Sequence, residues 1–477
     1  MEEERFDVEF DLEEEVEHLK KLLENKSYME LREYTSEMHP ADLAQVLEKF
    51  EQKERLVTFR LLRKDVATEA FTYMSDDARN ELVEGFSDSE IVTTLEQISL
   101  DDAADMLEDM PAGVVKRILT KASKETRESL NKLLRYPEYS AGSIMTPEYI
   151  RLLPTDTVGD ALREIRQQGP DAETIYTCYV VEKNHLLGVV TVRDMLLSDE
   201  NTPITELMDD SPICVNVLDD QENVARQMQK YDFNVMPVLD EEGMMVGIVT
   251  IDDAVDVLQD ENTEDMQKMA AIIPAEQAAS YFGTSVWTHA KQRIPWLLVL
   301  MLSATLTGLV TQHYEASFAV LPLLVSFMPM LMDTPGKCGN QTCTLMVRGL
   351  ALDDVSTRDL GRVVWKELRV SLIVGGLLGL INGLRIYLMY GVFRHPADPN
   401  ALRYAVVVSV ALVCAIMLAK LVGAVLPLIA KLIGADPAVM ATPFITTIVD
   451  ACSLIIYFHI AELIFSSQIT QNAAMLP

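Results

Sequence analysis

Residues 247–269 read GIVTIDDAVDVLQDENTEDMQKM, and their opening GIVTIDD repeats the GVVTVRD of residues 188–194. Each of these two phrases closes a longer unit whose pattern reads strand, helix, strand, turn, strand and helix. The short segments NH and EEG supply the hairpin turns between the last two strands of each unit. The repeat therefore predicts two similar α/β domains in tandem, over residues 138–200 and 201–258.

The chain before the repeat reads as helix after helix. In SLDDAADMLEDM, residues 99–110, Ser99 is a good N-cap, and Asp101 and Asp102 suit the positive end of a helix. Similar phrases recur from residue 12 to residue 136, each with apolar residues at spacings of three and four. Short helices stacked in this way predict an α-superhelical N-terminal domain over residues 1–137.

The chain after the repeat continues as a long acidic helix, predicted over residues 252–280. Its carboxylates recur at spacings of three and four, so several of them share or flank one face: Asp253, Asp256, Asp260, Glu261, Glu264 and Asp265. Like charges at this spacing destabilise an isolated helix. Two interpretations stay open from the residues alone. The face is either simply solvated, as most charge runs are, or it binds cations.

The last part of the chain, residues 287–477, is apolar enough to form an α-helical membrane domain. Five spans are long enough to cross a bilayer: 294–313, 317–334, 369–391, 402–430 and 438–466. The connection between the second and third spans carries five Lys or Arg side chains within 348–369, which predicts that it is cytoplasmic. We therefore expect a multi-pass protein of the inner (plasma) membrane, with a cytoplasmic N-terminus and an extracytoplasmic C-terminus.

Charge separates the two halves of the chain and excludes some functions. Residues 1–290 contain 63 acidic and 27 basic side chains, a net charge of −36, whereas residues 291–477 contain 10 and 13, a net charge of +3. Nucleic-acid binding needs clustered Lys and Arg, so we exclude nucleic acid as a partner.

The N-terminus lacks the apolar core of a signal peptide. The six cysteines are scattered without a C-x-x-C motif, which indicates neither a disulfide framework nor a zinc site.

Two stretches of the membrane domain depart from apolar sequence. Residues 333–344 read DTPGKCGNQTCT, which we expect to be broken backbone that lines a cavity or packs on protein. In the last span, Thr442, Thr446 and Asp450 are spaced by four and form one stripe on one helix face. An ionisable residue inside a span is costly, so Asp450 is a candidate functional residue, with packing inside the helix bundle as the alternative.

The repeated GVVTVRD and GIVTIDD resemble the closing motif of CBS domains, which occur in tandem pairs. In that family the Thr and Asp of T-x-x-D often face the ribose of a bound nucleotide. The resemblance implies an adenine-nucleotide site, with ATP as the candidate ligand, that uses Tyr176, Arg193 and Asp194 in the first copy. The alternative is that each Thr and Asp only cap the helix that follows.

The whole order of domains resembles the MgtE family of magnesium channels. The most specific stretches are GNQTCTLMVRGLAL (339–352) and DPAVMATPFITTIVDACSLIIYF (436–458), together with the acidic helix. The resemblance implies a homodimer with one pore on its two-fold axis and Asp450 as the selectivity carboxylate. It also implies that the acidic helix is a plug between sensor and pore. Near Asp450, Thr442, Thr446, Asn340 and Gln341 are candidates to contact the hydrated Mg²⁺ ion.

The resemblance also implies how the pathway closes. Cytosolic Mg²⁺ would bridge carboxylates of the N-terminal domain, the CBS pair and the plug, and so offset their repulsion. The candidate regulatory ligands are Asp220, Glu222, Asp232, Asp253, Asp256, Glu261, Glu264 and Asp265, with Asp101, Asp102 and Asp105 in the helical domain. The chain departs from the family pattern at Pro335 and Lys337, which stand where Gly and Asn are usual. The Lys337 substitution bears on conduction, because a cation near a divalent pathway should repel the ion.

Other functions fit the sequence less well. A transporter of Mn²⁺ or Co²⁺ would favour softer ligands near Asp450, and neither Cys452 nor His459 lies on its stripe. A CBS-regulated sensor that conducts no ion would not need the polar segment 333–344. A membrane enzyme finds no support, because the sequence has no Ser-His-Asp arrangement, phosphate loop or paired catalytic carboxylates. The sequence therefore predicts a non-enzymatic Mg²⁺ transport protein.

Overall fold

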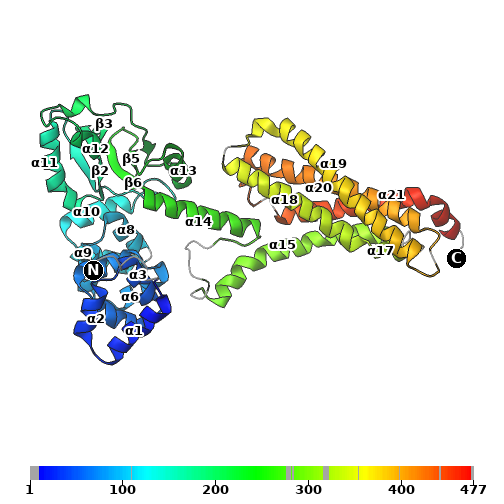
Figure 1. Cartoon of the computed structure of the whole chain (residues 1–477), viewed down its shortest axis with the longest axis horizontal. Coiled ribbons are helices and arrows are strands. Elements are labelled where there is room, and N and C mark those ends of the chain that lie inside the picture. The colour runs from blue at the N-terminus through cyan, green and yellow to red at the C-terminus, as the bar shows by residue number, and fades with distance from the viewer. Residues whose placement is uncertain are drawn as a thin grey trace, which may run out of the picture. The chain divides into compact units, whose positions relative to one another are not determined.

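A computed structural model gives the fold of the chain (Figure 1). It divides the chain into two compact units, one formed mainly by residues 1–261 and the other mainly by residues 262–477. We describe each unit by itself. The residues that the structure describes are 10–108, 110–274, 281, 284–314, 322–352, 354–396, 398–439 and 442–473.

The first unit begins with a superhelix of short helices, as predicted. They are α1 (Leu12–Glu24), α2 (Tyr28–Thr35), α3 (Pro40–Glu48), α4 (Gln52–Leu61), α5 (Lys64–Thr72), α6 (Asp76–Gly85), α7 (Asp88–Leu95), α8 (Leu100–Glu108), α9 (Ala112–Lys121) and α10 (Lys124–Leu133). Capping residues fix where several of these helices begin. At α7, Ser87 and Glu90 form a capping box in which the Glu90 carboxylate accepts from the Ser87 N–H at 2.8 Å. Fully buried apolar residues such as Leu43 and Leu47 hold neighbouring helices together.

The two predicted α/β repeats are present and share one topology. The first contains β1 (Tyr149–Leu152), α11 (Val158–Gln168), β2 (Thr174–Glu182), β3 (His185–Thr191) and α12 (Val192–Leu196). The second contains β4 (Val215–Asn216), α13 (Gln221–Tyr231), β5 (Val235–Leu239) and β6 (Met245–Thr250). In each copy the middle strand pairs parallel with the first strand and antiparallel with the third. The Tyr149 hydroxyl donates to the Met245 carbonyl at 3.3 Å and so links the two copies.

Helix α14 (Ile251–Met269) follows directly from β6, and the division between the units falls inside it. Its C-terminal end belongs to the second unit. There Met269 packs against the buried cluster that includes Cys343, Ala419 and Val449. The predicted acidic helix therefore exists, but it ends at residue 269 rather than at residue 280.

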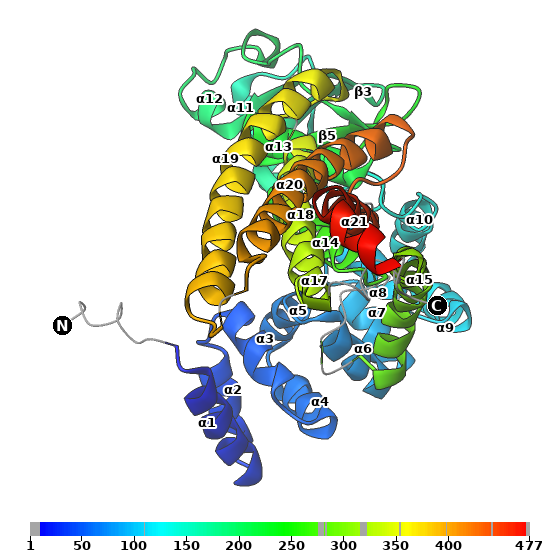
Figure 2. The same cartoon turned by 90° about the vertical axis from the view of Figure 1, so that its right-hand side faces the viewer.

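The second unit is a bundle of long helices. They are α15 (Val286–His313), α17 (Pro322–Val325), α18 (Met328–Ala351), α19 (Leu360–Tyr387), α20 (Ala401–Leu432) and α21 (Thr442–Ala473). Helix α20 packs against α18, α19 and α21 (Figure 1, Figure 2). Within the described part of the chain, four helical stretches are long and apolar enough to cross a membrane: Val286–His313, Thr357–Val392, Ala401–Leu432 and Phe444–Ser466.

The predictions for the second span and for residues 333–344 were wrong. Residues 317–321 of the span expected at 317–334 lie outside the described residues, and in the rest of it α17 ends at Val325 before α18 begins at Met328 and continues to Ala351. The polar segment 333–344 is helical throughout, although it contains Pro335. Its small residues let the helix enter the bundle closely, since a Cβ added at Gly423 would lie 2.3 Å from the Gly339 carbonyl oxygen. The exposed positions of the segment carry Asp333, Lys337 and Gln341, whereas its small residues are buried in the bundle.

Candidate functional site

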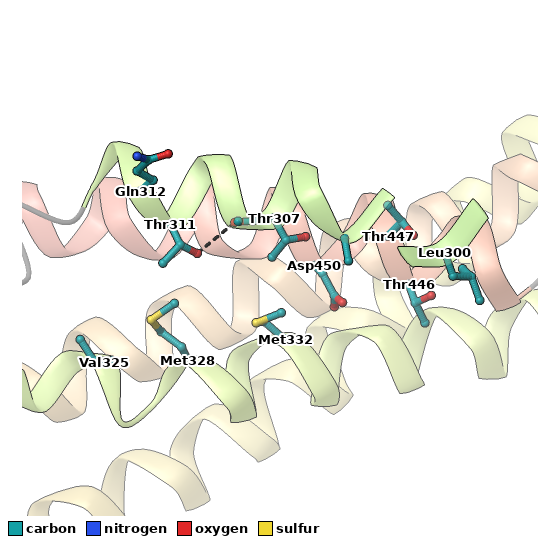
Figure 3. A pocket seen from close by; sticks show the side chains of 12 residues that line it. Leu300, Thr307, Thr311, Gln312, Val325, Met328, Met332, Thr446, Thr447 and Asp450 are labelled. Atoms are coloured by element: carbon teal, nitrogen blue, oxygen red, sulfur yellow. Dashed lines mark hydrogen bonds between the residues drawn. The ribbon is translucent and has the colours of Figure 1, made fainter. Parts of the chain in front are cut away.

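A cavity of about 910 Å³ lies beside Asp450 in the second unit (Figure 3). Its lining comes from α15, α17, α18 and α21: Leu300, Ala304, Thr307, Gly308, Thr311, Gln312, Val325, Met328, Met332, Thr446, Thr447 and Asp450. Asp450 is the only charged side chain among the described residues of this lining. The cavity therefore combines one carboxylate with several hydroxyls and an otherwise apolar wall.

The α21 stripe supplies Asp450 and Thr446, as the spacing predicts. Both side chains are half-buried. Opposite them stands Gly336 of α18, where an added Cβ would lie 3.9 Å from Asp450 Oδ1 and 3.7 Å from Thr446 Cγ2. The glycine thus leaves the carboxylate room that a larger side chain would fill. The side chain of Thr442 lies outside the described part of the chain, so its predicted role stays a prediction.

Helix α15 contributes a second hydroxyl stripe that the sequence analysis missed. Ser303, Thr307 and Thr311 are spaced by four, and the latter two line the cavity. Thr311 donates to the Thr307 carbonyl at 3.0 Å (Figure 3), and the Ser303 and Thr447 hydroxyls are 3.0 Å apart. The sequence contains the pattern that predicts this stripe, because hydroxyls at a spacing of four in an apolar helix form one polar face.

The other predicted pore residues lie elsewhere on α18. Neither Asn340 nor Gln341 belongs to the described lining of the cavity. The Asn340 Oδ1 atom is buried and has no hydrogen-bond partner among the described residues, whereas Gln341 is exposed. Lys337 is also exposed and pairs with Asp333 across 2.7 Å. The cation that departs from the family pattern is therefore neutralised by a carboxylate one turn away on its own helix.

In the first unit, an acidic cluster forms where the helical domain meets the α/β pair. Asp101 and Asp102 at the start of α8 lie near Asp253 at the start of α14. Burial, with the nearby Asp101 charge, raises the pKa of Asp102 to about 6 and that of Asp253 to about 8. Burial also raises the pKa of Asp101, whose Oδ1 atom has no hydrogen-bond partner among the described residues. These carboxylates repel one another, so a bound cation would lower their free energy.

Other members of this cluster were either predicted or missed. Asp105, a candidate regulatory ligand, lies one turn after Asp101 and interacts electrostatically with it. Glu148 and Glu173 were missed. They precede the paired parallel strands β1 and β2, and the Glu148 carboxylate accepts from the Leu100 N–H at 3.3 Å. Burial, and next the Asp101 charge, raise the pKa of Glu148 to about 7. An acidic residue just before each parallel strand is the signal that could have found them.

The remaining regulatory candidates lie on or at the ends of α13 and along α14. Asp220 caps the start of α13, Asp232 ends it in a left-handed conformation, and Glu222 pairs with Arg226. Along α14, burial and the Asp252 charge raise the pKa of Asp256, and Glu261 accepts from Gln221 Nε2 at 3.3 Å. Asp265 follows Glu264 on the same helix, in the part that belongs to the second unit.

The C-terminal end of α14 carries an ion-pair relay. Lys268 contacts Glu264 at 2.9 Å and Asp436 at 2.7 Å. Asp436 also accepts from the Ala438 N–H at 2.8 Å in the turn that precedes α21. Glu264 is thus compensated by a lysine. Across the described residues, no group of three or more His, Cys, Asp or Glu side chains is already arranged to hold a metal ion.

The predicted nucleotide residues lie at the surface of the first α/β repeat. Tyr176, Arg193 and Asp194 are exposed. Asp194 accepts from the Thr191 hydroxyl at 2.5 Å, and the Asp194 N–H donates back to that hydroxyl at 3.1 Å. Thr191 and Asp194 therefore cap α12 in this structure. The three exposed side chains are accessible to a ligand, and their predicted role in nucleotide binding stays a prediction.

Comparison with known families accounts for most of the chain. Residues 38–139 match the model of the MgtE intracellular N domain, residues 141–200 and 204–260 match the CBS domain, and residues 328–460 match the divalent cation transporter model MgtE. The magnesium transporter MgtE of Thermus thermophilus is 37% identical over 455 residues, which covers 94% of this chain and 98% of that protein.

Two solved structures resemble the first unit. The soluble part of a magnesium transporter covers 53% of this chain and 99% of that chain, at 32% identity and a TM-score of 0.50. A structure described as the cytosolic domain of the Mg²⁺ channel MgtE in complex with ATP covers 51% of this chain and 99% of that chain, at 38% identity and a TM-score of 0.49.

Proposed function

This chain belongs to the MgtE family and transports Mg²⁺, and we propose that the ion passes Asp450 along the cavity between α15, α18 and α21. The observation that carries the proposal is a half-buried carboxylate in an apolar bundle, facing a cavity whose described lining includes no Lys or Arg. A charged carboxylate without a basic partner in an apolar bundle is energetically costly unless a cation binds to it.

The chemistry of the cavity suits magnesium. Mg²⁺ dehydrates reluctantly and binds through one or two carboxylates while it keeps several waters. A carboxylate surrounded by the hydroxyls of Thr446, Thr447 and Thr307 can bind a hydrated ion, because the hydroxyls accept hydrogen bonds from its waters. The opposing Gly336 supplies no side chain that would displace those waters. In a homodimer, which we propose, two such carboxylates would face one axis.

We further propose that the acidic cluster of the first unit senses cytosolic Mg²⁺. Asp101, Asp102 and Asp253 repel one another, and burial together with the Asp101 charge raises the pKa of Asp253. Mg²⁺ that bridges these acids would stabilise the compact arrangement of the helical domain, the CBS pair and α14. The compact arrangement would close the pathway, so that internal Mg²⁺ limits its own entry. The N-terminus is cytoplasmic and the C-terminus extracytoplasmic in this proposal.

The exposed group of Tyr176, Arg193 and Asp194 is our candidate for an ATP site. An aromatic side chain offers stacking to the base, and an arginine suits a phosphate. ATP that prefers the compact arrangement would raise its apparent Mg²⁺ affinity by linkage. Calorimetry with the full-length protein tests this. Heat of ATP binding that Tyr176→Ala and Arg193→Ala abolish supports the site, and the same heat in both variants contradicts it.

Mg²⁺ uptake into proteoliposomes tests the pathway. We expect Asp450→Asn to lower the uptake rate about a hundredfold, because it removes the charge that offsets ion dehydration. Glu462→Gln is the matched control, since it neutralises another carboxyl on α21 outside the described lining of the cavity. Equal loss in both variants would contradict the assignment. Uptake of Mn²⁺ or Co²⁺ at the Mg²⁺ rate would indicate a broader divalent transporter.

A further inference from the structure

Three helices of the membrane domain meet at a buried polar network outside the cavity. It consists of Thr342 on α18, Glu367 on α19 and Lys420 on α20, which are 1%, 6% and 6% exposed. The Thr342 hydroxyl donates to Glu367 Oε2 at 3.0 Å, and Lys420 Nζ donates to the same hydroxyl at 3.2 Å. The Lys420 ammonium lies 3.5 Å from Glu367 Oε2. One atom of α18 therefore contacts both charges.

Stability alone is a weak account of this network. A buried ion pair repays little more than the desolvation of its two charges, and apolar residues of similar volume often serve as well. What the pair adds is direction, because each hydrogen bond fixes both a distance and an angle. Since both bonds end on Thr342, they set the rotation of α18 about its own axis relative to α19 and α20.

The rotation of α18 matters because its glycines make close contacts on one side of the helix. Gly336 faces Asp450, and Gly339 lies in a narrow slot where an added Cβ would be 2.9 Å from Ile445 Cγ2 and 3.0 Å from the Ala419 carbonyl oxygen. At the C-terminal end of α18, Lys431 of α20 donates to the Leu350 carbonyl at 3.2 Å. Lys420 and Lys431 of α20 thus contact α18 at two points that follow Gly339.

We propose that Thr342, Glu367 and Lys420 are positioning residues for the ion pathway. They hold α18 in the rotation that presents Gly336, and not a bulkier neighbour, to the Asp450 carboxylate. The inference rests on the proposed pathway at Asp450. Loss of the network lets α18 turn, which changes the space around the carboxylate and with it the discrimination between hydrated Mg²⁺ and Na⁺.

The ratio of Mg²⁺ uptake to Na⁺ uptake in proteoliposomes of the full-length protein tests the proposal. Thr342→Val removes the hydroxyl at constant shape, and the paired change Glu367→Gln with Lys420→Met removes both charges together. We expect each to lower the ratio at least about tenfold while thermal unfolding stays near that of the wild type. Thr342→Ser keeps the hydroxyl and should stay within about twofold of the wild-type ratio.

Ser371→Ala is the matched control, because Ser371 is a fully buried hydroxyl on α19 that donates only within its own helix, to Leu368. Wild-type ratios in both Thr342→Val and the paired variant would overturn the proposal. If Thr342→Val does not fold, the paired variant decides. Asp450→Asn is measured alongside. A wild-type ratio in Asp450→Asn contradicts the pathway, whereas a reduced ratio there with no change in the network variants contradicts only the positioning role.

Discussion

The two halves of the molecule use carboxylates in opposite ways. In the first unit, Asp101, Asp102, Asp105 and Asp253 crowd together, and burial, followed by their mutual charges, raises the pKa values of the last three. In the membrane unit, Glu367 is matched by Lys420, and Asp450 stands alone in its cavity lining. Many weak, coupled acids suit a graded sensor of ion concentration. A single acid in an apolar bundle suits a selective ion pathway.

The largest effect should separate the two regions. Asp450→Asn should nearly abolish Mg²⁺ uptake, yet leave the response of the first unit to Mg²⁺ intact, because the acidic cluster lies in that unit. Protease protection of residues 250–290 across a Mg²⁺ titration reports this response. A shifted Mg²⁺ midpoint for protease protection in Asp450→Asn would contradict the separate roles of the two regions.

The converse variant should remove sensing and keep the pathway. With Asp253, Asp256 and Glu261 all changed to Ala, we expect the Mg²⁺ midpoint for protection to rise at least about tenfold, because several weak bridges are lost together. Uptake should then persist at high internal Mg²⁺. The matched control removes three exposed acids from α1, with Glu13, Glu14 and Glu17 changed to Ala. An unchanged midpoint in the first variant would mean that these α14 carboxylates are a solvated face.

Proton binding should compete with Mg²⁺ in the acidic cluster of the first unit. The pKa of Asp253 is raised to about 8, so the folded state binds a proton there more tightly than the unfolded chain does. Its contribution to stability is complete below its unfolded value, near pH 4, and is lost as the pH rises through about 8.

Without Mg²⁺, we therefore expect the unfolding temperature of the first unit to fall by about 5 °C between about pH 5.5 and pH 8. Added Mg²⁺ should restore more stability at the higher pH. Asp253→Asn should flatten the dependence, while Asp240→Asn, in the turn between β5 and β6, should not. Stability that rises with pH without Mg²⁺ would contradict the repulsion on which the sensor depends.

The smallest effect concerns Lys337. Because this lysine is exposed and already paired with Asp333, Lys337→Gln should change Mg²⁺ uptake by less than about twofold. A tenfold rise in uptake, measured in the same proteoliposome assay, would show that the cation reaches the pathway and repels the ion.

The sequence predicted what depends on local periodicity. Strand alternation and helical spacing located the two α/β repeats, and the spacing of four placed Thr446 and Asp450 on one face. The helical state of 333–344 was not predictable in the same way, because it depends on the contact of Gly339 with Gly423 on another helix. Glu148 and Glu173 were missed because the parallel pairing of β1 and β2 and the approach of α8 bring them together. Glu367 and Lys420 meet only through tertiary packing.

The most direct test of the central claim is the reversal potential of the full-length protein in a planar bilayer, with Mg²⁺ on one side and Na⁺ on the other. Wild-type protein should reverse near the Mg²⁺ equilibrium potential. Asp450→Asn should move the reversal toward the Na⁺ potential, while the triple α14 variant should keep the wild-type value because only its gating is changed. A wild-type reversal potential in Asp450→Asn would contradict the assignment of Asp450 as the selective carboxylate of the pathway.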